Sequence, residues 1–376
     1  MRRRRSGIAR DGMSPTSRDV AKRAGVSVAT VSRVLNESSS VSPDSRRKVL
    51  QAIQALDYQP SRAAQQLRAR RGRVLGLIIS DIQNPFFTSV VRGIEDLAHE
   101  HGYSLVLCNS DENAEKERLY VNVMRAEGAA GVILAAVSED SPYVRSLVDQ
   151  RIPVVAIDRR LKDASIDSVC VDNVEAACEA VSTLIDMGHR RIGLIAVPLS
   201  ITTGRDRHAG YLRAFHERRL KVSREWIRFG DTRETGGYAC AGELLQLDSP
   251  VTALFTTNSL MTLGALRRIH ESGLQIPQDI SIIGFDDMPW ASLLRPALSN
   301  VAQPTYELGR TAAQLLLERL ENPQRPPAHV VLKTRLVMRD SAAPLPAGSD
   351  IKTRGSDSRR ESGRAQRERD REMAHG

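Results

Sequence analysis

The chain has 376 residues, of which 41% are hydrophobic, and it carries a formal net charge of +9 from 54 basic and 45 acidic side chains. No apolar run approaches the roughly 18 residues that a membrane span requires, and no apolar segment follows Arg2 to Arg5, as it would in a secretory signal. We therefore expect neither a membrane protein nor an exported one, and place the chain in the cytoplasm.

Residues 1–14 are expected to form a basic disordered tail, and residues 15–60 a small helical domain. Thr16 can cap a first helix, with Asp19 completing a capping box, and Gly25 ends it. Ser27 can cap a second helix. The apolar positions of this second helix form one narrow stripe: Val28, Val31, Val34 and Leu35. Its outward positions are Ala29, Thr30, Ser32 and Arg33. Two short helices joined at a glycine predict a helix-turn-helix, which reads DNA bases from its second helix; the alternative is an ordinary surface hairpin.

A third helix is predicted over 41–56, with Ser42 as its cap and Pro43 at its first position. Residues 61–71 then form a short segment rich in Ala, Gln and Arg, opened by Ser61. An isolated helix of this length is marginal in water, so we expect it to order only when something packs against it.

The positive charge is concentrated at one end of the chain. Residues 1–73 hold 17 basic and 5 acidic side chains, whereas the remainder holds 37 basic and 40 acidic ones. A localised positive field is typical of phosphate binding, so the charge supports a nucleic-acid partner for the N-terminal part.

Beyond residue 72 the sequence alternates between strand and helix patterns, which predicts an α/β fold with two doubly wound lobes. Continuous apolar runs, typical of parallel strands covered on both faces, occur at 74–79, 104–107, 131–134, 153–157, 191–197, 251–255 and 280–284. The effector-binding and dimerisation core is expected over 72–340, with lobe 1 over about 72–171 and 304–330 and lobe 2 over about 172–303 and 331–340. The remaining residues, 341–376, lack apolar periodicity and predict a disordered tail.

Polar and aromatic residues follow the predicted strands, at the ends where open parallel sheets bind ligands. Charged and amide groups can bind neighbouring hydroxyls of a polyhydroxylated ring, and aromatic faces can cover its C–H surface. The candidate effector-binding residues are Asn84, Phe86, Phe87, Asp158, Arg159, Arg207, Asn258, Asp286 and Gln303. Two alternatives stay open: a structural salt bridge between the lobes for Asp158 and Arg159, and helix-start packing for Phe86 and Phe87.

Motifs of catalysis, nucleotide binding and metal binding are missing from the sequence. No G-x-G-x-x-G follows the first predicted strand. The four cysteines, Cys108, Cys170, Cys178 and Cys240, lack C-x-x-C spacing and are interpreted as reduced, mostly buried thiols. Gly188-His189-Arg190-Arg191 is interpreted as a turn before a strand rather than a metal site. We expect no enzymatic activity, no cofactor and no metal.

From Thr16 to about Asp340 the chain resembles the lactose-repressor (LacI/GalR) family of bacterial transcription regulators. The resemblance rests on Asp19-Val-Ala, Ala24-Gly-Val-Ser, Thr30-Val-Ser-Arg-Val-Leu-Asn36, Val41-Ser-Pro and Ala63-Ala-Gln-Gln-Leu67. It implies a homodimer on a palindromic DNA operator, with 61–71 as a hinge helix and Leu67 as a wedge in the minor groove. Arg33 is expected to contact a base, Val28 and Ala29 base edges or thymine methyls, and Ser27, Thr30 and Ser32 phosphates. Asn36, Ser61 and Ala64 complete the predicted DNA-binding set.

The nine cleft candidates also resemble the sugar-contacting positions of periplasmic ribose-binding proteins, which implies a pentose or similar sugar as effector. Two residues depart from that pattern: Thr232 stands where ligand-stacking relatives often carry an aromatic residue, and Ser259 follows Asn258 where Asp is usual.

The sequence therefore predicts a homodimeric repressor whose DNA affinity is controlled by a small molecule, with a sugar as the expected effector. Two alternatives remain: the same regulator responding to a purine or another small metabolite, or a sugar-binding module that acts through protein partners.

Overall fold

The computed structural model describes residues 15–35, 41–58 and 73–345. The chain divides into two compact units, Met1–Gly72 and Arg73–Gly376, each with a core of its own. Asn36, Ser61, Ala64 and Leu67 lie outside the described residues, as do the two predicted tails up to residue 14 and from residue 346. The DNA-binding roles predicted for those four residues stay predictions.

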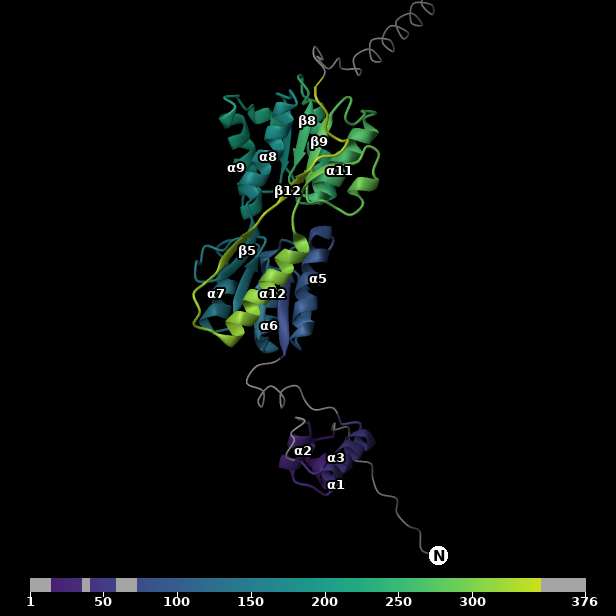
Figure 1. Cartoon of the computed structure of the whole chain (residues 1–376), viewed down its shortest axis with the longest axis vertical. Helices are drawn as coiled ribbons and strands as arrows, with labels where there is room; N and C mark the ends of the chain where they lie inside the picture. Colours follow the sequence, from purple (N-terminus) through teal and green to yellow (C-terminus); the bar gives the residue numbers. More distant parts are fainter. Residues whose placement is uncertain (1–14, 36–40, 59–72, 346–376) are drawn as a thin grey trace, which may run out of the picture. The chain divides into compact units, whose positions relative to one another are not determined.

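The first unit contains three helices, α1 (Ser17–Ala24), α2 (Val28–Leu35) and α3 (Pro43–Leu56) (Figure 1). The predicted capping box is confirmed, because the Asp19 N–H donates to the Thr16 hydroxyl and the Asp19 carboxylate accepts the Thr16 N–H at 2.9 Å. Gly25 ends α1 with a φ of 66°, a left-handed conformation that glycine adopts without strain. These local signals suffice to set the turn between α1 and α2.

The apolar stripe predicted for α2 needs one correction. Val31 and Val34 are buried in a core shared with α1 and α3, and Leu35 packs against that core. Val28, in contrast, is 38% exposed, because it stands in the first turn of α2, outside the cluster that covers Val31 and Val34. Its side chain is thus on the surface of the headpiece, by which we mean the unit of α1 to α3.

Lobe 1 contains a six-stranded parallel sheet in the order β11-β5-β4-β3-β1-β2. Its elements are β1 (Val74–Ile79), α5 (Pro85–Glu100), β2 (Ser104–Asn109), α6 (Ala114–Ala126), β3 (Gly131–Leu134), α7 (Pro142–Asp149), β4 (Val154–Ile157), β5 (Asp167–Val171), α12 (Thr305–Glu321) and β11 (His329–Leu332). Helices α5 and α12 pack on one face of the sheet, and α6 and α7 on the other (Figure 1).

Lobe 2 contains a second six-stranded sheet, in the order β12-β10-β9-β8-β6-β7, parallel except for β12. Its elements are α8 (Asn173–Asp186), β6 (Ile192–Ala196), α9 (Thr202–Glu217), β7 (Ile227–Phe229), α10 (Glu234–Leu245), β8 (Ala253–Thr256), α11 (Ser259–Glu271), β9 (Ser281–Phe285), β10 (Ser299–Ala302) and β12 (Arg335–Val337), with 3-10 turns at Arg224–Trp226 and Ala291–Leu293. Helices α8 and α9 cover one face, and α10 and α11 the other.

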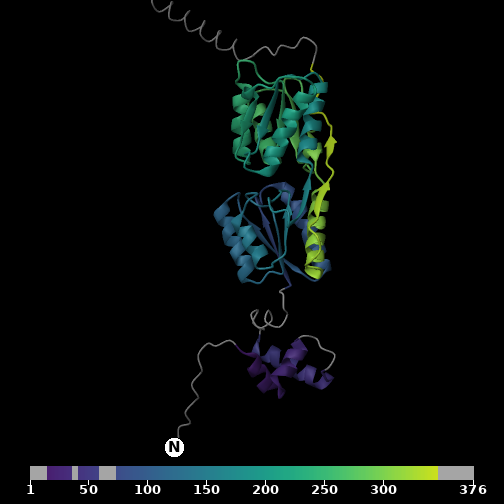
Figure 2. The ribbon, with the colours of Figure 1, turned by 90° about the vertical axis from the view of Figure 1, so that its left-hand side faces the viewer.

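The chain passes between the lobes three times, from β5 to α8, from β10 to α12 and from β11 to β12 (Figure 2). The last crossing follows Leu332, slightly later than the boundary expected at 331, because β11 stays paired with β5 up to Leu332. Ser341 and Ala342 are buried in lobe 2, in a range assigned to the tail. Ser341 explains this, since its Oγ donates to Ile282 O at 2.7 Å and accepts the Ser299 N–H at 2.8 Å.

The apolar runs predict seven of the twelve strands in the described part of the chain. All seven predicted strands are present, whereas β5, β7, β10, β11 and β12 were missed because they are short, polar or at an edge. The expectation that 104–107 is covered on both faces was wrong: β2 is the edge strand of its sheet, and Val106 and Leu107 are 41% and 37% exposed.

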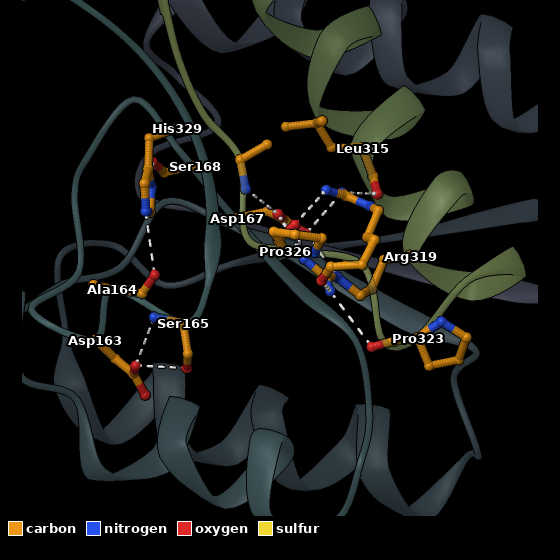
Figure 3. Close-up of polar contacts among 12 residues, drawn as sticks. Asp163, Ala164, Ser165, Asp167, Ser168, Leu315, Arg319, Pro323, Pro326 and His329 are labelled. Carbon is orange, nitrogen blue, oxygen red and sulfur yellow. Dashed lines mark hydrogen bonds and ion pairs between the residues drawn. The ribbon is translucent and has the colours of Figure 1, made fainter.

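A polar cluster fixes the connection from α12 to β11 in lobe 1 (Figure 3). The buried Asp167 carboxylate accepts hydrogen bonds from Arg319 Nε at 3.0 Å, Arg319 Nη2 at 2.9 Å, Arg325 Nη2 at 2.9 Å and the Ala328 N–H at 2.8 Å. Asp167 begins β5, Arg319 is near the end of α12, and Ala328 immediately precedes β11. One carboxylate thus joins the three lobe 1 segments that lead to the crossings.

His189 joins the C-terminal end of lobe 2 to the sheet. As predicted, it stands in a turn before a strand, and its ring lies 2.9 Å from Thr252 Oγ1 and 3.1 Å from Ala343 O. Because a carbonyl can only accept, Nε2 carries the proton and Nδ1 accepts from the hydroxyl. Burial lowers the pKa of His189 below the ordinary value, so the folded protein holds this ring neutral.

We expect His189 to make the protein less stable in acid. As the pH falls through the ordinary histidine pKa of about 6.5, the unfolded chain binds a proton that the folded chain resists, so the free energy of unfolding falls. Replacement of His189 by Gln should make the free energy of unfolding depend less steeply on pH between about pH 7 and 5. Urea unfolding at a series of pH values measures this slope. Replacement of the exposed His99 by Gln is the matched control and should leave the slope as in the wild type. If His189→Gln and the wild type have equal slopes, a neutral buried His189 does not cause the acid sensitivity.

Candidate functional site

All nine predicted effector-binding residues line one pocket between the lobes, with a cavity volume of about 40 Å³. Whether they bind an effector stays a prediction. The structure adds seven lining residues that were not on the predicted set: Ser80, Asp81, Glu112, Val197, Ile201, Thr203 and Thr232. Most of these also follow a strand end, since Ser80 follows β1, Glu112 comes shortly after β2 and Val197 follows β6. Applying the strand-end rule to every strand would have found them.

The start of α5 forms one wall of the pocket. Asn84 caps the helix by accepting the Phe86 N–H at 3.0 Å. Phe86 and Phe87 are each 3% exposed, and their rings meet edge to face at 4.9 Å. Both rings belong to the core of lobe 1 and also line the pocket. The helix-start packing considered for them is therefore real and coexists with a position at the pocket.

Arg159 is held within lobe 1. Its Nη1 donates to Glu112 Oε2 at 2.7 Å and to Ala136 O at 3.0 Å, and its Nη2 donates to Ser80 Oγ at 3.2 Å and also to Glu112 Oε1. The salt bridge between lobes considered for Asp158 and Arg159 is therefore wrong, because Glu112 lies in the same lobe. Burial raises the pKa of Asp158, whose carboxylate is 3.6 Å from Arg159 Nε.

Arg207, from α9, is the buried cation of lobe 2. Its Nε donates to Asn173 Oδ1 at 2.7 Å, its Nη1 donates to Thr257 O at 2.6 Å, and its guanidinium lies 3.6 Å from the centre of the Phe285 ring. Burial lowers the pKa of Arg207 despite the nearby Asp286 and Asp158 carboxylates. These contacts fix the orientation of the guanidinium at the pocket.

Two buried polar atoms at the pocket have no hydrogen-bond partner among the described residues: Arg159 Nε, a donor, and Gln303 Oε1, an acceptor. Gln303 uses its other end to donate from Nε2 to Asp286 Oδ1 at 2.6 Å. Buried polar groups nearly always form hydrogen bonds, so a donor and an acceptor that lack them on one pocket point to a ligand that offers both kinds of group.

The backbone around the pocket is strained. Glu112, Asp158, Thr232 and Asp286 have φ values between 55° and 76°, although none is glycine. Such conformations cost on the order of 1–3 kcal/mol each and concentrate at functional sites. Thr232 is the clearest case, because β-branched residues rarely adopt a positive φ; its carbonyl accepts from Asn258 Nδ2 at 2.8 Å.

The headpiece presents a second candidate site on α2. Ser27, Val28, Ala29 and Arg33 are exposed, and Thr30 and Ser32 are half-buried. Ser27 Oγ accepts the Thr30 N–H at 3.1 Å and lies 2.9 Å from Thr30 Oγ1, so Ser27 caps the helix as predicted. Contacts of these residues with DNA stay predictions.

Residues 15–35, 41–58 and 73–345 contain no helix with the length and apolar character of a membrane span. The same ranges contain no group of three His, Cys, Asp or Glu side chains that could hold a metal ion. All four cysteines are free and buried, as predicted.

A helix-turn-helix headpiece joined to two lobes around a polar pocket defines a ligand-responsive regulator of transcription, and comparison with known proteins agrees. Residues 16–61 match the family of bacterial regulatory proteins, lacI family, and residues 181–342 match the periplasmic binding protein-like domain. The transcriptional repressor PurR of Escherichia coli O139:H28 is 35% identical over 333 residues, which cover 88% of this chain and 98% of PurR. The chain belongs to the LacI family of transcriptional repressors.

Two solved structures illustrate the similarity. The lac repressor dimer bound to operator and an anti-inducer is 29% identical, with a TM-score of 0.76, and the match covers 88% of this chain and all of that one. A LacI family regulator from Enterococcus faecium with bound ribose is 29% identical, with a TM-score of 0.66, and the match covers 73% of this chain and all of that one.

Proposed function

We propose that this repressor binds a palindromic operator as a homodimer and that a neutral, polyhydroxylated small molecule, a pentose such as ribose, controls its affinity for DNA. The observation that carries the proposal is the pocket with two buried polar atoms that have no hydrogen bond among the described residues. They are the donor Arg159 Nε, which lies 3.6 Å from the Asp158 carboxylate, and the acceptor Gln303 Oε1. A hydroxyl group can accept from the first and donate to the second. The protein acts by binding, without catalysis, in the cytoplasm where the chromosome lies.

The charge of the pocket favours a neutral effector over an anionic one. Four carboxylates line it, those of Asp81, Glu112, Asp158 and Asp286, against the two guanidinium groups of Arg159 and Arg207. Glu112 already occupies both Nη atoms of Arg159. The acids thus outnumber the cations, and a sugar phosphate would add further negative charge to the pocket, at a cost in affinity.

A purine is the second candidate effector. Thr232 stands at the pocket in place of an aromatic side chain, so one stacking face expected for a sugar is missing there. Thermal-shift measurement with D-ribose, ribose 5-phosphate and hypoxanthine distinguishes the candidates, because a ligand that binds only the folded state raises its stability. The proposal requires the largest rise with the neutral sugar.

The edge of lobe 1 supports a second copy as partner. Four large apolar side chains on β2 and α6 are more than a third exposed: Val106, Leu107, Leu119 and Val123. Exposed apolar groups that gather on one edge strand and its neighbouring helix mark association surfaces. A palindromic operator has two-fold symmetry, which a second copy of this chain would match.

We expect Arg33→Ala to relax the sequence specificity of DNA binding at one base pair in each half-site, by about 1–3 kcal/mol. A guanidinium that donates two hydrogen bonds to guanine is the commonest specific contact, and Arg33 is exposed on α2. Operators obtained by selection from random duplexes would be titrated as single-base variants by fluorescence anisotropy.

The matched control is Arg47→Ala, an exposed arginine of α3 that pairs with Asp44. It should weaken binding to all the duplexes similarly, or not at all, without changing their order. If Arg33→Ala ranks the variants as wild type does, the assignment of α2 as the reading helix is wrong.

A further inference from the structure

Among the described residues three ion pairs join the lobes beside the pocket, and the longest joins Arg233 to Asp111 at 4.0 Å. The other two are shorter. Arg160 Nη2 lies 2.5 Å from Asp206 Oδ2, and Arg205 Nη2 lies 2.6 Å from Glu139 Oε2. Glu139 and Arg160 stand in the loops after β3 and β4 of lobe 1, whereas Arg205 and Asp206 stand in the first turns of α9 in lobe 2. We call these two contacts the interlobe pairs.

Two residues of the interlobe pairs are sequence neighbours of residues that line the pocket. Arg160 follows Arg159, and Asp206 precedes Arg207, and both of these neighbours line the pocket. Successive residues of a helix project about 100° apart, so α9 presents Arg205 and Asp206 to lobe 1 and Arg207 to the pocket. The backbone segments at Arg159 and Arg207 therefore carry pocket-lining residues and also residues of these two contacts between the lobes.

The small cavity volume is consistent with movement of the lobes when a ligand enters. The pocket holds about 40 Å³, whereas sites for small ligands measure about 300–1,000 Å³. Separation of the lobes would supply the room that a pentose needs. Separation pulls the loops after β3 and β4 away from α9 and so breaks both interlobe pairs.

We infer that the interlobe pairs act as a latch that holds the cleft closed without effector and limits how often it opens. The inference concerns regulation of the site under Proposed function and rests on that proposal, although its test needs no effector.

The two carboxylates are shielded, with 12% and 24% of the Asp206 and Glu139 side chains exposed. Lys162 Nζ, 3.8 Å from Glu139, extends the pairs into a network, which is the arrangement in which surface charges contribute most. The Arg205 hydrogen bond also holds the pKa of Glu139 below its ordinary value.

Cys170 is a built-in reporter of opening. Its side chain is 3% exposed, burial raises the pKa of its thiol, and the charged groups that act on it are Arg160 and Asp158 of lobe 1 and Asp206 of lobe 2. We expect this thiol to become accessible when the lobes separate, because Arg160, its hydrogen-bond partner, then loses its contact with Asp206. Cys178 and Cys240 lie in the cores of lobe 2 and react only when that lobe unfolds.

The test is pulse labelling of the ligand-free full chain with N-ethylmaleimide, with the modified cysteines located by mass spectrometry. Glu139→Arg and Arg205→Glu each place like charges in contact and should raise the Cys170 labelling rate at least about fivefold, by the Coulomb repulsion across the pair. The double variant, which restores an opposite pair, should return to within about twofold of wild type. These two positions are chosen because neither acts directly on the Cys170 thiol. High salt should speed labelling in wild type but not in the neutral Glu139→Gln, Arg205→Gln double variant.

Unchanged Cys170 labelling in both single variants, with Cys178 and Cys240 protected, would overturn the latch, and so would a double variant that stays as fast as the singles. If a charge-reversal variant also exposes Cys178, the milder variant Glu139→Gln is used in its place. In that variant the Cys170 labelling rate must rise at least about twofold. Addition of D-ribose tests the proposed effector separately, because a bound effector should slow the labelling of Cys170. If the variants behave as expected but ribose does not slow labelling, only the choice of effector is contradicted.

Discussion

Arg207→Ala is expected to abolish the thermal stabilisation that D-ribose gives the wild-type protein. Arg207 is the buried cation of lobe 2 at the pocket, and charge-assisted hydrogen bonds of the kind it can offer a hydroxyl contribute about 1.5–3 kcal/mol. Their loss corresponds to roughly a 10- to 150-fold weaker affinity. Burial raises the pKa of Asp158 and of Asp286, and removing the guanidinium takes away a positive charge that opposes this rise.

Titration calorimetry with D-ribose measures this effect, and urea unfolding without ligand separates it from a general loss of stability. The matched control is Arg213→Ala, on the same helix, whose arginine pairs with Glu175 and Glu217 at the surface. It should leave ribose affinity unchanged. An unaltered affinity in Arg207→Ala would show that the pocket is not where the sugar binds.

Asp167→Ala is expected to lower the free energy of unfolding by about 3–5 kcal/mol, the usual cost of removing one partner from a buried ion pair. The substitution leaves the guanidinium groups of Arg319 and Arg325 facing each other, each with 14% of its side chain exposed. It also leaves the Ala328 N–H without its acceptor. Chemical unfolding of the full chain measures the loss.

Asp163→Ala is the control for this substitution, because Asp163 lies in the same region (Figure 3) but accepts only from Ser165, in an exposed turn. Its cost should stay below about 1 kcal/mol. Equal losses in the two variants would mean that the Asp167 cluster contributes no more than a surface turn.

The sequence predicts those parts of the fold that follow local rules. Thr16 and Ser42 cap their helices as expected, because capping depends on residues three positions apart. The buried central strands are visible as apolar runs. Strand β5 was missed because it opens with Asp167, and the arginine that neutralises this aspartate is 152 residues further along the chain.

The pocket was predictable for a related reason. Parallel strands end at one edge of a sheet, so residues just after the strands gather there, and Asp158, Asn258 and Asp286 were found in this way. Their partners were not predictable. Glu112 meets Arg159 only because β2 and β4 lie in one sheet at a particular register, which local patterns do not encode.

Control of the repressor by an effector requires coupling between the pocket and DNA binding. Its most direct test is the affinity of the full chain for its selected operator, measured by fluorescence anisotropy with and without D-ribose at a concentration that calorimetry shows to fill the pocket. We expect ribose to change the dissociation constant at least about fivefold, the lower end of typical allosteric coupling, and Arg207→Ala to remove the change. The same dissociation constant with the pocket empty and filled would contradict the account.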